Sequence, residues 1–367
     1  MSVYLDHNAT TTIRASALDA VRAALVETGN ASSVHQAGRQ ARARVEQARN
    51  EVAMLAGAQD AKGVIFTSGA TEANNTVIQH FAGQRIFTSS VEHPSVREAD
   101  ASAERIPVTR DGTVDLDAFA AMMDGGDAPA LVSVIMAGNE TGVIQPVAEI
   151  AAIAKAKGAL VHTDAVQAAG RIPLDMVALG VDYLTLSAHK MGGPQGVGAL
   201  VCAPKAPPVK LLYGGGQERR QRAGTENVAG IAGFGAAAKE ARETIDAFQT
   251  LATLRDDMEK RFVQSLSGIT IHGANAPRTA NTSCFSLAGV PADTQLMALD
   301  LAGYCVSSGS ACSSGSVQPS KILGAMGVDD DLASNALRIS FGWPTTRADV
   351  EGFIGTYIDL AKKWVAA

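Results

Sequence analysis

The chain has 367 residues, of which 46% are hydrophobic and 19% charged, a composition typical of soluble globular proteins. Its formal charge of −6 at pH 7, with only short and interrupted basic clusters, argues against a nucleic-acid partner. The first residues lack the apolar core of a signal peptide, and no segment approaches the roughly 20 apolar residues of a membrane span. We therefore expect a cytoplasmic protein, and the length predicts two domains.

Short apolar segments rich in β-branched residues alternate with helical segments from about residue 60 to 205. This alternation is typical of an α/β fold with a mostly parallel sheet, and such sheets place binding sites at the carboxyl ends of their strands. Helices are expected at 71–83 and at 146–158, the second with Pro146 at its start and Gly158 at its end. The expected strands are 63–68, 85–90, 130–137, 159–165, 182–190 and 196–203.

The pattern then changes to shorter strands and turns, centred on 281–289 and 337–342. Such a change in periodicity indicates a second structural unit. We expect a large domain at 15–250 and a smaller α+β domain at 251–367 that also includes residues 1–14.

A single lysine, Lys190, ends a strand that is otherwise expected to be entirely buried, and a glycine-rich segment (192–196) follows it. Burial at that point would favour the neutral amine, which is the form that condenses with an aldehyde to a Schiff base. The alternative is a strand-end lysine that reaches into solvent.

Two other strand ends carry groups that a pyridoxal-phosphate site requires. Asp164 is a candidate partner for a pyridinium nitrogen, and Gln167 follows three residues later. Ala70 and Thr71 lie between a strand and a helix start, where free N–H groups and the helix dipole attract a phosphate. Taken singly, Asp164 and the segment 67–72 are also compatible with helix capping, but their combination with Lys190 favours the cofactor site.

A series of ordered motifs then resembles the cysteine desulfurases of the NifS and IscS type, which are pyridoxal-phosphate enzymes of aminotransferase class V. The resemblance runs nearly end to end and implies the aspartate-aminotransferase-like fold of pyridoxal-phosphate-dependent transferases, with no metal. The motifs are "YLDHNATT", "FTSGATEANN", "VEHPSV", "GNETGVIQP", "HTDAVQAAG", "SAHK" with "GPQGVGAL", "GGGQE", "RAGTEN", "SSGSACSSG" and "LRISFG".

The resemblance also implies roles for individual residues. Lys190 matches the Schiff-base lysine, Asp164 the partner of the pyridinium nitrogen, and Gln167 the donor to the phenolic oxygen of the ring. Thr225 matches a threonine that reaches the phosphate of the neighbouring subunit, which implies a homodimer. The remaining matches are His93, stacked on the ring and catalytic; Ala70, Thr71, Ser187 and His189 at the phosphate; and Asn139 and Arg338 at the substrate carboxylate.

Three of these residues have structural alternatives. His93 and His189 are also compatible with ordinary hydrogen-bonded histidines, and Arg338 with a structural ion pair. A half-buried arginine needs an anionic partner, and a substrate carboxylate would serve. The segment after Lys190 departs from the family pattern, with Gly192 where relatives often have an aromatic residue and Gln195 where they often have lysine, so we expect local loop differences.

Four cysteines are too few for a disulfide scaffold, and none forms a C-x-x-C pair. Cys202, Cys284 and Cys305 have apolar neighbours and are expected to be buried core thiols. Cys312 differs, because serines and glycines surround it, and we expect a mobile loop there. The alternative is a tolerated small residue.

With a Schiff-base site in the same chain, the thiolate of Cys312 can attack the sulfur of L-cysteine, giving a persulfide on Cys312 and L-alanine. The segment around Cys312 resembles the branch of the family that serves iron–sulfur cluster assembly. By that analogy, the sulfur passes to an acceptor protein such as an iron–sulfur scaffold. The alternatives are a selenocysteine lyase, another aminotransferase-type enzyme of class V, and a sulfur-carrier scaffold without turnover.

Overall fold

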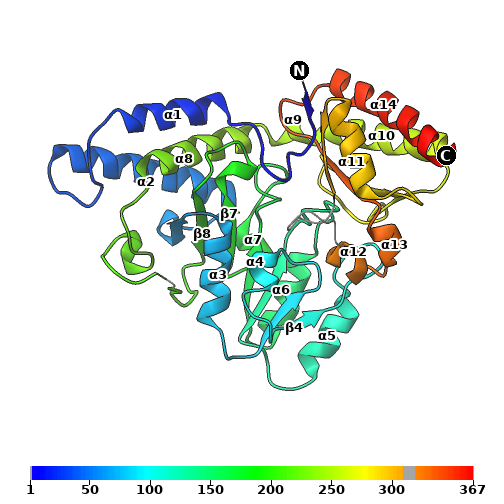
Figure 1. Ribbon diagram of the computed structural model, residues 1–367. Coiled ribbons are helices and arrows are strands. Elements are labelled where there is room, and N and C mark those ends of the chain that lie inside the picture. The colour runs from blue at the N-terminus through cyan, green and yellow to red at the C-terminus, as the bar shows by residue number, and fades with distance from the viewer. Residues whose placement is uncertain (1, 211, 309–318, 367) are drawn as a thin grey trace.

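The computed structural model describes residues 2–210, 212–308 and 319–366 (Figure 1). Cys312 lies outside these ranges. Two structural units lie side by side, and each has its own sheet and its own apolar core (Figure 1). We call the unit built on the larger sheet the large unit and the other the small unit.

The large unit is built on a sheet of seven strands within the described ranges, in the order β2-β8-β7-β6-β5-β3-β4. β8 runs antiparallel to both of its neighbours, and the other pairs are parallel. The predicted mostly parallel sheet is therefore confirmed. The strands are β2 (Val64–Thr67), β3 (Ile86–Ser89), β4 (Glu104–Ile106), β5 (Leu131–Ile135), β6 (Leu160–Asp164), β7 (Tyr183–Ser187) and β8 (Gly198–Cys202).

Helices cover both faces of this sheet, which explains why its central strands are apolar on both sides. Successive residues of β7 point to opposite faces, so that Leu184 packs in one core while Tyr183 packs in the other beside α3. The helices are α1 (Ala15–Leu25), α2 (Gln36–Ala56), α3 (Ala70–His80), α4 (Pro94–Arg97), α5 (Leu116–Asp124), α6 (Val147–Ala156), α7 (Met176–Leu179), α8 (Val228–Glu243) and α9 (Ile245–Gln249).

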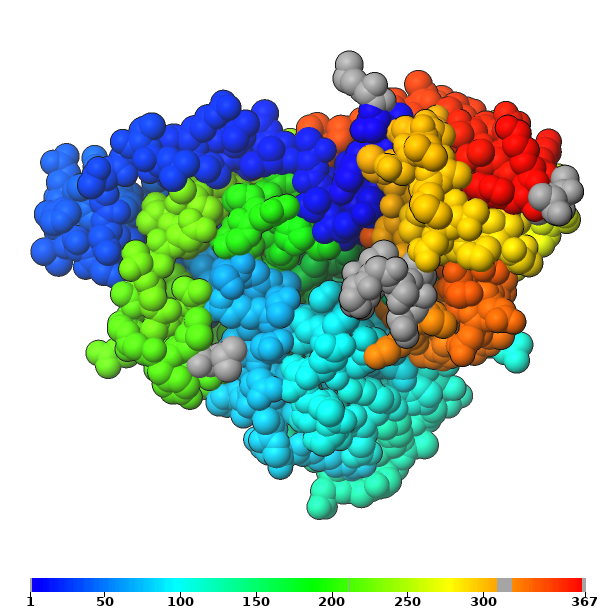
Figure 2. Space-filling view, viewed as in Figure 1, coloured from blue at the N-terminus to red at the C-terminus, as the bar shows by residue number. Residues whose placement is uncertain are grey.

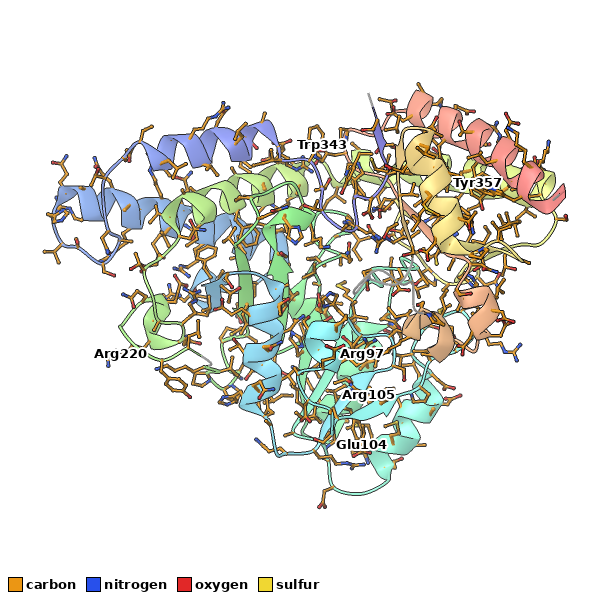
Figure 3. All side chains as sticks on the ribbon, viewed as in Figure 1. Arg97, Glu104, Arg105, Arg220, Trp343 and Tyr357 are labelled. Carbon is orange, nitrogen blue, oxygen red and sulfur yellow. The ribbon has the colours of Figure 1, made fainter. Side chains whose placement is uncertain are left out.

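The small unit has an antiparallel sheet, in the order β12-β13-β10-β9 among the described strands. Its core is aromatic: Phe262, Phe285 and Phe353 surround Tyr357, which Figure 3 labels. The predicted division at residue 250 falls between α9 and α10 and stays a prediction. The elements are α10 (Leu251–Ser265), β9 (Ile269–Ile271), β10 (Thr282–Leu287), α11 (Ala292–Leu301), β12 (Ser307–Ser308), α12 (Lys321–Ala325), α13 (Asp330–Ala333), β13 (Ala336–Ser340) and α14 (Arg347–Ala366).

The first residues of the chain cross from the small unit to the large one. β1 (Val3–Tyr4) pairs with β11 (Tyr304–Cys305), and Ser340 accepts from His7 N at 3.1 Å. Thr11 N then donates to the carbonyl of His189 in the large unit at 3.1 Å. Figure 2 shows this dark blue segment between the green part of the large unit and the yellow part of the small unit.

An ion pair fixes the loop before Thr225. Arg49 of α2 bonds both carboxylate oxygens of Glu218 at 2.7 and 2.9 Å, and Phe66 N donates to the same carboxylate at 2.9 Å. Both charged side chains are almost fully buried, with 4% and 3% exposed. The chain there is strained, since Glu218, Arg219 and Arg220 have positive φ angles.

We expect Glu218→Ala to lower the free energy of unfolding by about 3–5 kcal/mol, because it removes the buried anion of Arg49 and leaves only the exposed Glu46 at 3.2 Å. Urea unfolding followed by circular dichroism measures the change. Asp19→Ala breaks the exposed pair of Asp19 with Arg22 and serves as the control, for which we expect little change. Equal effects of the two substitutions would contradict the structural importance of the Glu218 pair.

None of the helices in the described ranges is long and apolar enough to cross a membrane.

Candidate active site

A cavity of about 760 Å³ opens at the carboxyl ends of β2, β6 and β7. The amino-terminal residues 8–10 and the small-unit residues Ser307, Ser308 and Arg338 complete its wall. The structure brings most of the sequence-predicted residues together in this wall: Ala70, Thr71, His93, Asn139, Asp164, Gln167, Ser187, His189, Lys190 and Arg338.

Lys190 lies in the short helical turn Ala188–Lys190, just beyond the end of β7 at Ser187. The expected strand at 182–190 thus ends three residues too late, because Met191 N bonds back to the carbonyl of Ala188 and closes a turn. The Lys190 amine is half-buried and donates to the carbonyls of Asn8 and, at 2.8 Å, of Ala9. Burial, helped by nearby arginines, lowers the pKa of Lys190 to about 7.

Asp164 is the last residue of β6 and is buried. One of its oxygens accepts from Val166 N at 3.0 Å, and the other accepts from the Asn74 amide of α3 at 2.7 Å. These two donors hold the carboxylate in place without neutralising it. Asp164 therefore presents a negative charge to the cavity, where it can pair with a protonated ring nitrogen.

The first turn of α3 forms one end of the cavity at Gly69, Ala70 and Thr71. Its leading N–H groups have no partner within the helix, and the helix dipole adds positive potential there. Glu72 lies in the same turn, but Arg222 pairs with its carboxylate at 2.8 Å and offsets its charge. With Ser187 and His189 also in the cavity wall, this end suits a phosphate.

His93 caps the amino terminus of α4, where its Nδ1 accepts from Ser95 N at 3.1 Å. Burial lowers the pKa of His93, and the charge of Lys190 acts in the same direction while Asp164 opposes it. The ring is thus neutral, with its Nε2 free to carry the proton. It lies in the cavity wall with Asp164 and Lys190, and its stacking on a cofactor ring stays a prediction.

Arg338 projects from β13 and is held on two sides. It donates to the carbonyl of Asn139 at 3.2 Å and to the carboxylate of Asp6 at 2.6 Å. Its Nε has no partner, and neither does the side-chain oxygen of Asn139. Within the described residues, both unpaired atoms belong to the cavity wall, where a bound carboxylate and its neighbours would satisfy them.

Gln167 donates from Nε2 to the carbonyl of Asn8 at 3.0 Å and leaves Oε1 unpaired. The amide nitrogen carries a second N–H, for which the described residues show no acceptor, so it can donate to a ring oxygen while the bond to Asn8 is kept. Asn8 itself contacts much of the site: its backbone carbonyl meets Gln167 and Lys190, and its side chain meets Asn139 and Arg171. Sequence reasoning assigned it no role.

Thr225 does not line the main cavity. It is exposed and lies in the wall of a separate cavity of about 150 Å³, together with Ser68 and Gly196, which line both cavities. This position is at the outer side of the phosphate end and is open to solvent in the single chain.

The prediction for the other cysteines was partly wrong. Cys284 is buried and burial raises the pKa of its thiol, but Cys202 and Cys305 are only half-buried because each lies at the end of a short strand. In the part of the chain that the structure describes, no cluster of His, Cys, Asp and Glu could hold a metal ion.

Comparisons with known proteins agree with this geometry. The chain is 41% identical to "Cysteine desulfurase IscS" of Dictyoglomus turgidum over 363 residues, which covers 95% of this chain and 91% of that protein. It is 39% identical to "IscS-like cysteine desulfurase" of Mycobacterium tuberculosis, with 95% of this chain and 93% of that protein covered.

The fold matches a solved NifS-like protein from Rickettsia africae with a TM-score of 0.91 and 34% identity, covering 99% of this chain and 100% of the other. The model of the "Aminotransferase class-V" family matches residues 3–353. Because this match spans nearly the whole chain and includes every described residue of the cavity wall, the chain belongs to the aminotransferase class-V family.

Proposed function

We propose that this protein is a pyridoxal-phosphate-dependent cysteine desulfurase, which converts L-cysteine to L-alanine and keeps the sulfur as a persulfide on Cys312. The observation that carries the proposal is the convergence, in one cavity, of the Lys190 amine, the Asp164 carboxylate and the amino terminus of α3. The relatives named as cysteine desulfurases support the choice of substrate.

The residues present fit pyridoxal phosphate. The phosphate would lie at Ala70 and Thr71, and the ring nitrogen at Asp164. Gln167 lies in the same wall, and its buried Oε1 atom has no hydrogen-bond partner among the described residues. Lys190 is positioned to bind the aldehyde carbon through its amine. When bound, this cofactor supplies an electron sink for the pair of electrons left when the α-proton of the substrate is removed.

The side chains then divide the remaining tasks. The Lys190 amine, once the substrate has displaced it, accepts the α-proton, since its lowered pKa of about 7 suits a general base. Arg338 and Asn139 hold the substrate carboxylate. The Cys312 thiolate takes the substrate sulfur, so that a C–S bond breaks, an S–S bond forms, and the carbon skeleton gains the proton that completes alanine.

We further propose a homodimer in which Thr225 of each chain completes the phosphate site of the other. The support is its exposed position beside Ser68 and Gly196, at the outer side of the phosphate end. The persulfide sulfur passes to an acceptor protein, for which an iron–sulfur scaffold is our candidate, in the cytoplasm.

The test of the function is product analysis. Purified protein with pyridoxal phosphate, L-cysteine and a thiol reductant should release alanine and sulfide in equal amounts. Without reductant, mass spectrometry should find one extra sulfur on the peptide that contains Cys312. Alanine without sulfide, pyruvate as the carbon product, or turnover of selenocysteine alone would contradict a cysteine desulfurase.

Arg338→Ala should raise KM for cysteine by roughly 10- to 150-fold, because it removes charged hydrogen bonds to the substrate carboxylate. The covalent attachment of the cofactor to Lys190 should persist. Steady-state kinetics measure the change, and Arg347→Ala, which removes an exposed arginine of α14, is the control with unchanged KM. An unchanged KM in Arg338→Ala would remove Arg338 from the substrate site.

A further inference from the structure

Arg171 is a buried cation without an anionic partner among the described residues. It is 3% exposed, and its guanidinium donates only to neutral acceptors: the side-chain oxygen of Asn8 at 2.5 Å and the carbonyl of His7 at 3.3 Å. Burying a charge is costly unless an opposite charge compensates it. Two other buried arginines at the large unit have such partners, since Arg49 pairs with Glu218 and Arg14 pairs with Glu240.

Arg171 and Lys190 both bond to Asn8. Asn8 accepts from Arg171 with its side chain and from the Lys190 amine with its backbone carbonyl. Arg171, Lys190 and His7 also line one small cavity of about 10 Å³, which has room for about one water molecule. Lys190 also faces the main cavity, but on the side of Arg171 there is room for little water, so a charge on the arginine is screened less there than in bulk solvent.

We propose that Arg171 is a positioning residue for Lys190. The positive charge of Arg171, on the far side of Asn8 from the lysine, keeps the Lys190 amine neutral and ready to bind an aldehyde. The proposal deepens the proposed function, on which it rests for the identity of the aldehyde. Burial lowers the pKa of Arg171 to about 9, so its guanidinium still carries a positive charge at neutral pH, where it can act on the lysine. A carboxylate partner for Arg171 would cancel the effect, and the described structure has none there.

The other charges that face Lys190 do not replace Arg171. Arg338 also disfavours the charged amine, but Asp6 pairs with it at 2.6 Å and offsets its field. Asp164 favours the charged amine from the opposite side. The neighbouring imidazoles of His7, His93 and His189 are neutral, since burial lowers the pKa of each. Burial is the largest cause of the lowered pKa of Lys190, and Arg171 is the largest among the charges.

The experiment measures the titration of Lys190 in the apoprotein, without turnover. Apoprotein is acetylated briefly with acetic anhydride at a series of pH values, and mass spectrometry gives the rate at the Lys190 peptide. In the wild type the midpoint should lie near pH 7. In Arg171→Gln, which keeps a donor for Asn8 but removes the charge, the midpoint should rise by about one pH unit or more, leaving about fivefold less neutral amine at pH 7.

Two further variants separate charge from structure. Arg171→Lys keeps the charge and should keep the midpoint near that of the wild type. Arg278→Gln removes a half-buried arginine of the small unit that pairs with Glu259, and should also leave the midpoint unchanged. Thermal unfolding of each apoprotein checks the fold.

Equal midpoints in the wild type and Arg171→Gln would overturn the proposal. Should Arg171→Gln fail to fold, a wild-type midpoint near 10 would overturn the proposal as well, since the pKa of Lys190 would then be that of an ordinary lysine amine. Failure of the proposed function appears separately, as absent alanine and sulfide from the wild type.

Discussion

Lys190→Ala is expected to lower the release of alanine and sulfide by roughly 10²- to 10⁴-fold, because it removes both the amine that binds the cofactor and the base that moves the α-proton. The side chain is half-buried, and its amine donates to the carbonyls of Asn8 and Ala9 at the edge of the cavity. In the site described here, its neighbours are imidazoles and guanidinium groups that do not carry an amine. No nearby described side chain can therefore replace it.

Borohydride reduction followed by peptide mass spectrometry gives a second measurement. The wild type should carry the reduced cofactor on the Lys190 peptide, whereas the variant should hold the cofactor only without a covalent bond. Lys205→Ala, at an exposed lysine after β8, is the matched control and should behave as the wild type. Full turnover or a covalent cofactor in Lys190→Ala would overturn the assignment.

Cys312→Ala is expected to abolish sulfide release and the persulfide while leaving the cofactor bound. The reason is chemical: without the thiolate, the substrate sulfur has no nucleophile to accept it. The other three thiols are poor substitutes, because burial raises the pKa of Cys202 to about 12 and also raises that of Cys284, while Cys305 is held in β11.

The measurement compares sulfide release and intact mass in the wild type, Cys312→Ala and Cys202→Ala. We expect the Cys202 variant to keep both the activity and the extra sulfur on Cys312. If Cys312→Ala released sulfide at the rate of the wild type, Cys312 would be a loop residue without a chemical role, and another class-V reaction would be the better proposal.

Much of the fold and cavity wall could be predicted from the sequence because the signals are local. Buried parallel strands produce apolar segments, and Asp164, Lys190 and Thr71 stand out because each follows such a segment directly. The family resemblance added Arg338 and Asn139, which lie far from these strands along the chain but beside them in the folded protein.

Three residues of the site escaped prediction because their importance depends on contacts between distant segments. Asn74 holds Asp164 from the neighbouring helix, and Asn8 reaches four site residues from the amino terminus. Arg171 is unusual only because it is buried without an anion, and burial of one side chain cannot be read from its neighbours in sequence. The hydrogen bond from the Gln167 amide to the Asn8 carbonyl could not be predicted for the same reason.

The position of the amino-terminal segment has a consequence for the synthesis of the protein. Asn8, one of the first residues to be made, bonds from its backbone to the Ser340 hydroxyl, 332 residues later, and the Leu5 carbonyl accepts from Ser340 N. On a ribosome, the large unit can fold before β13 exists, but the segment that supports Lys190 then lacks its bonds to Ser340, and Arg338 is not yet in place. A nascent chain therefore has no finished catalytic centre, and the enzyme matures only after translation is nearly complete.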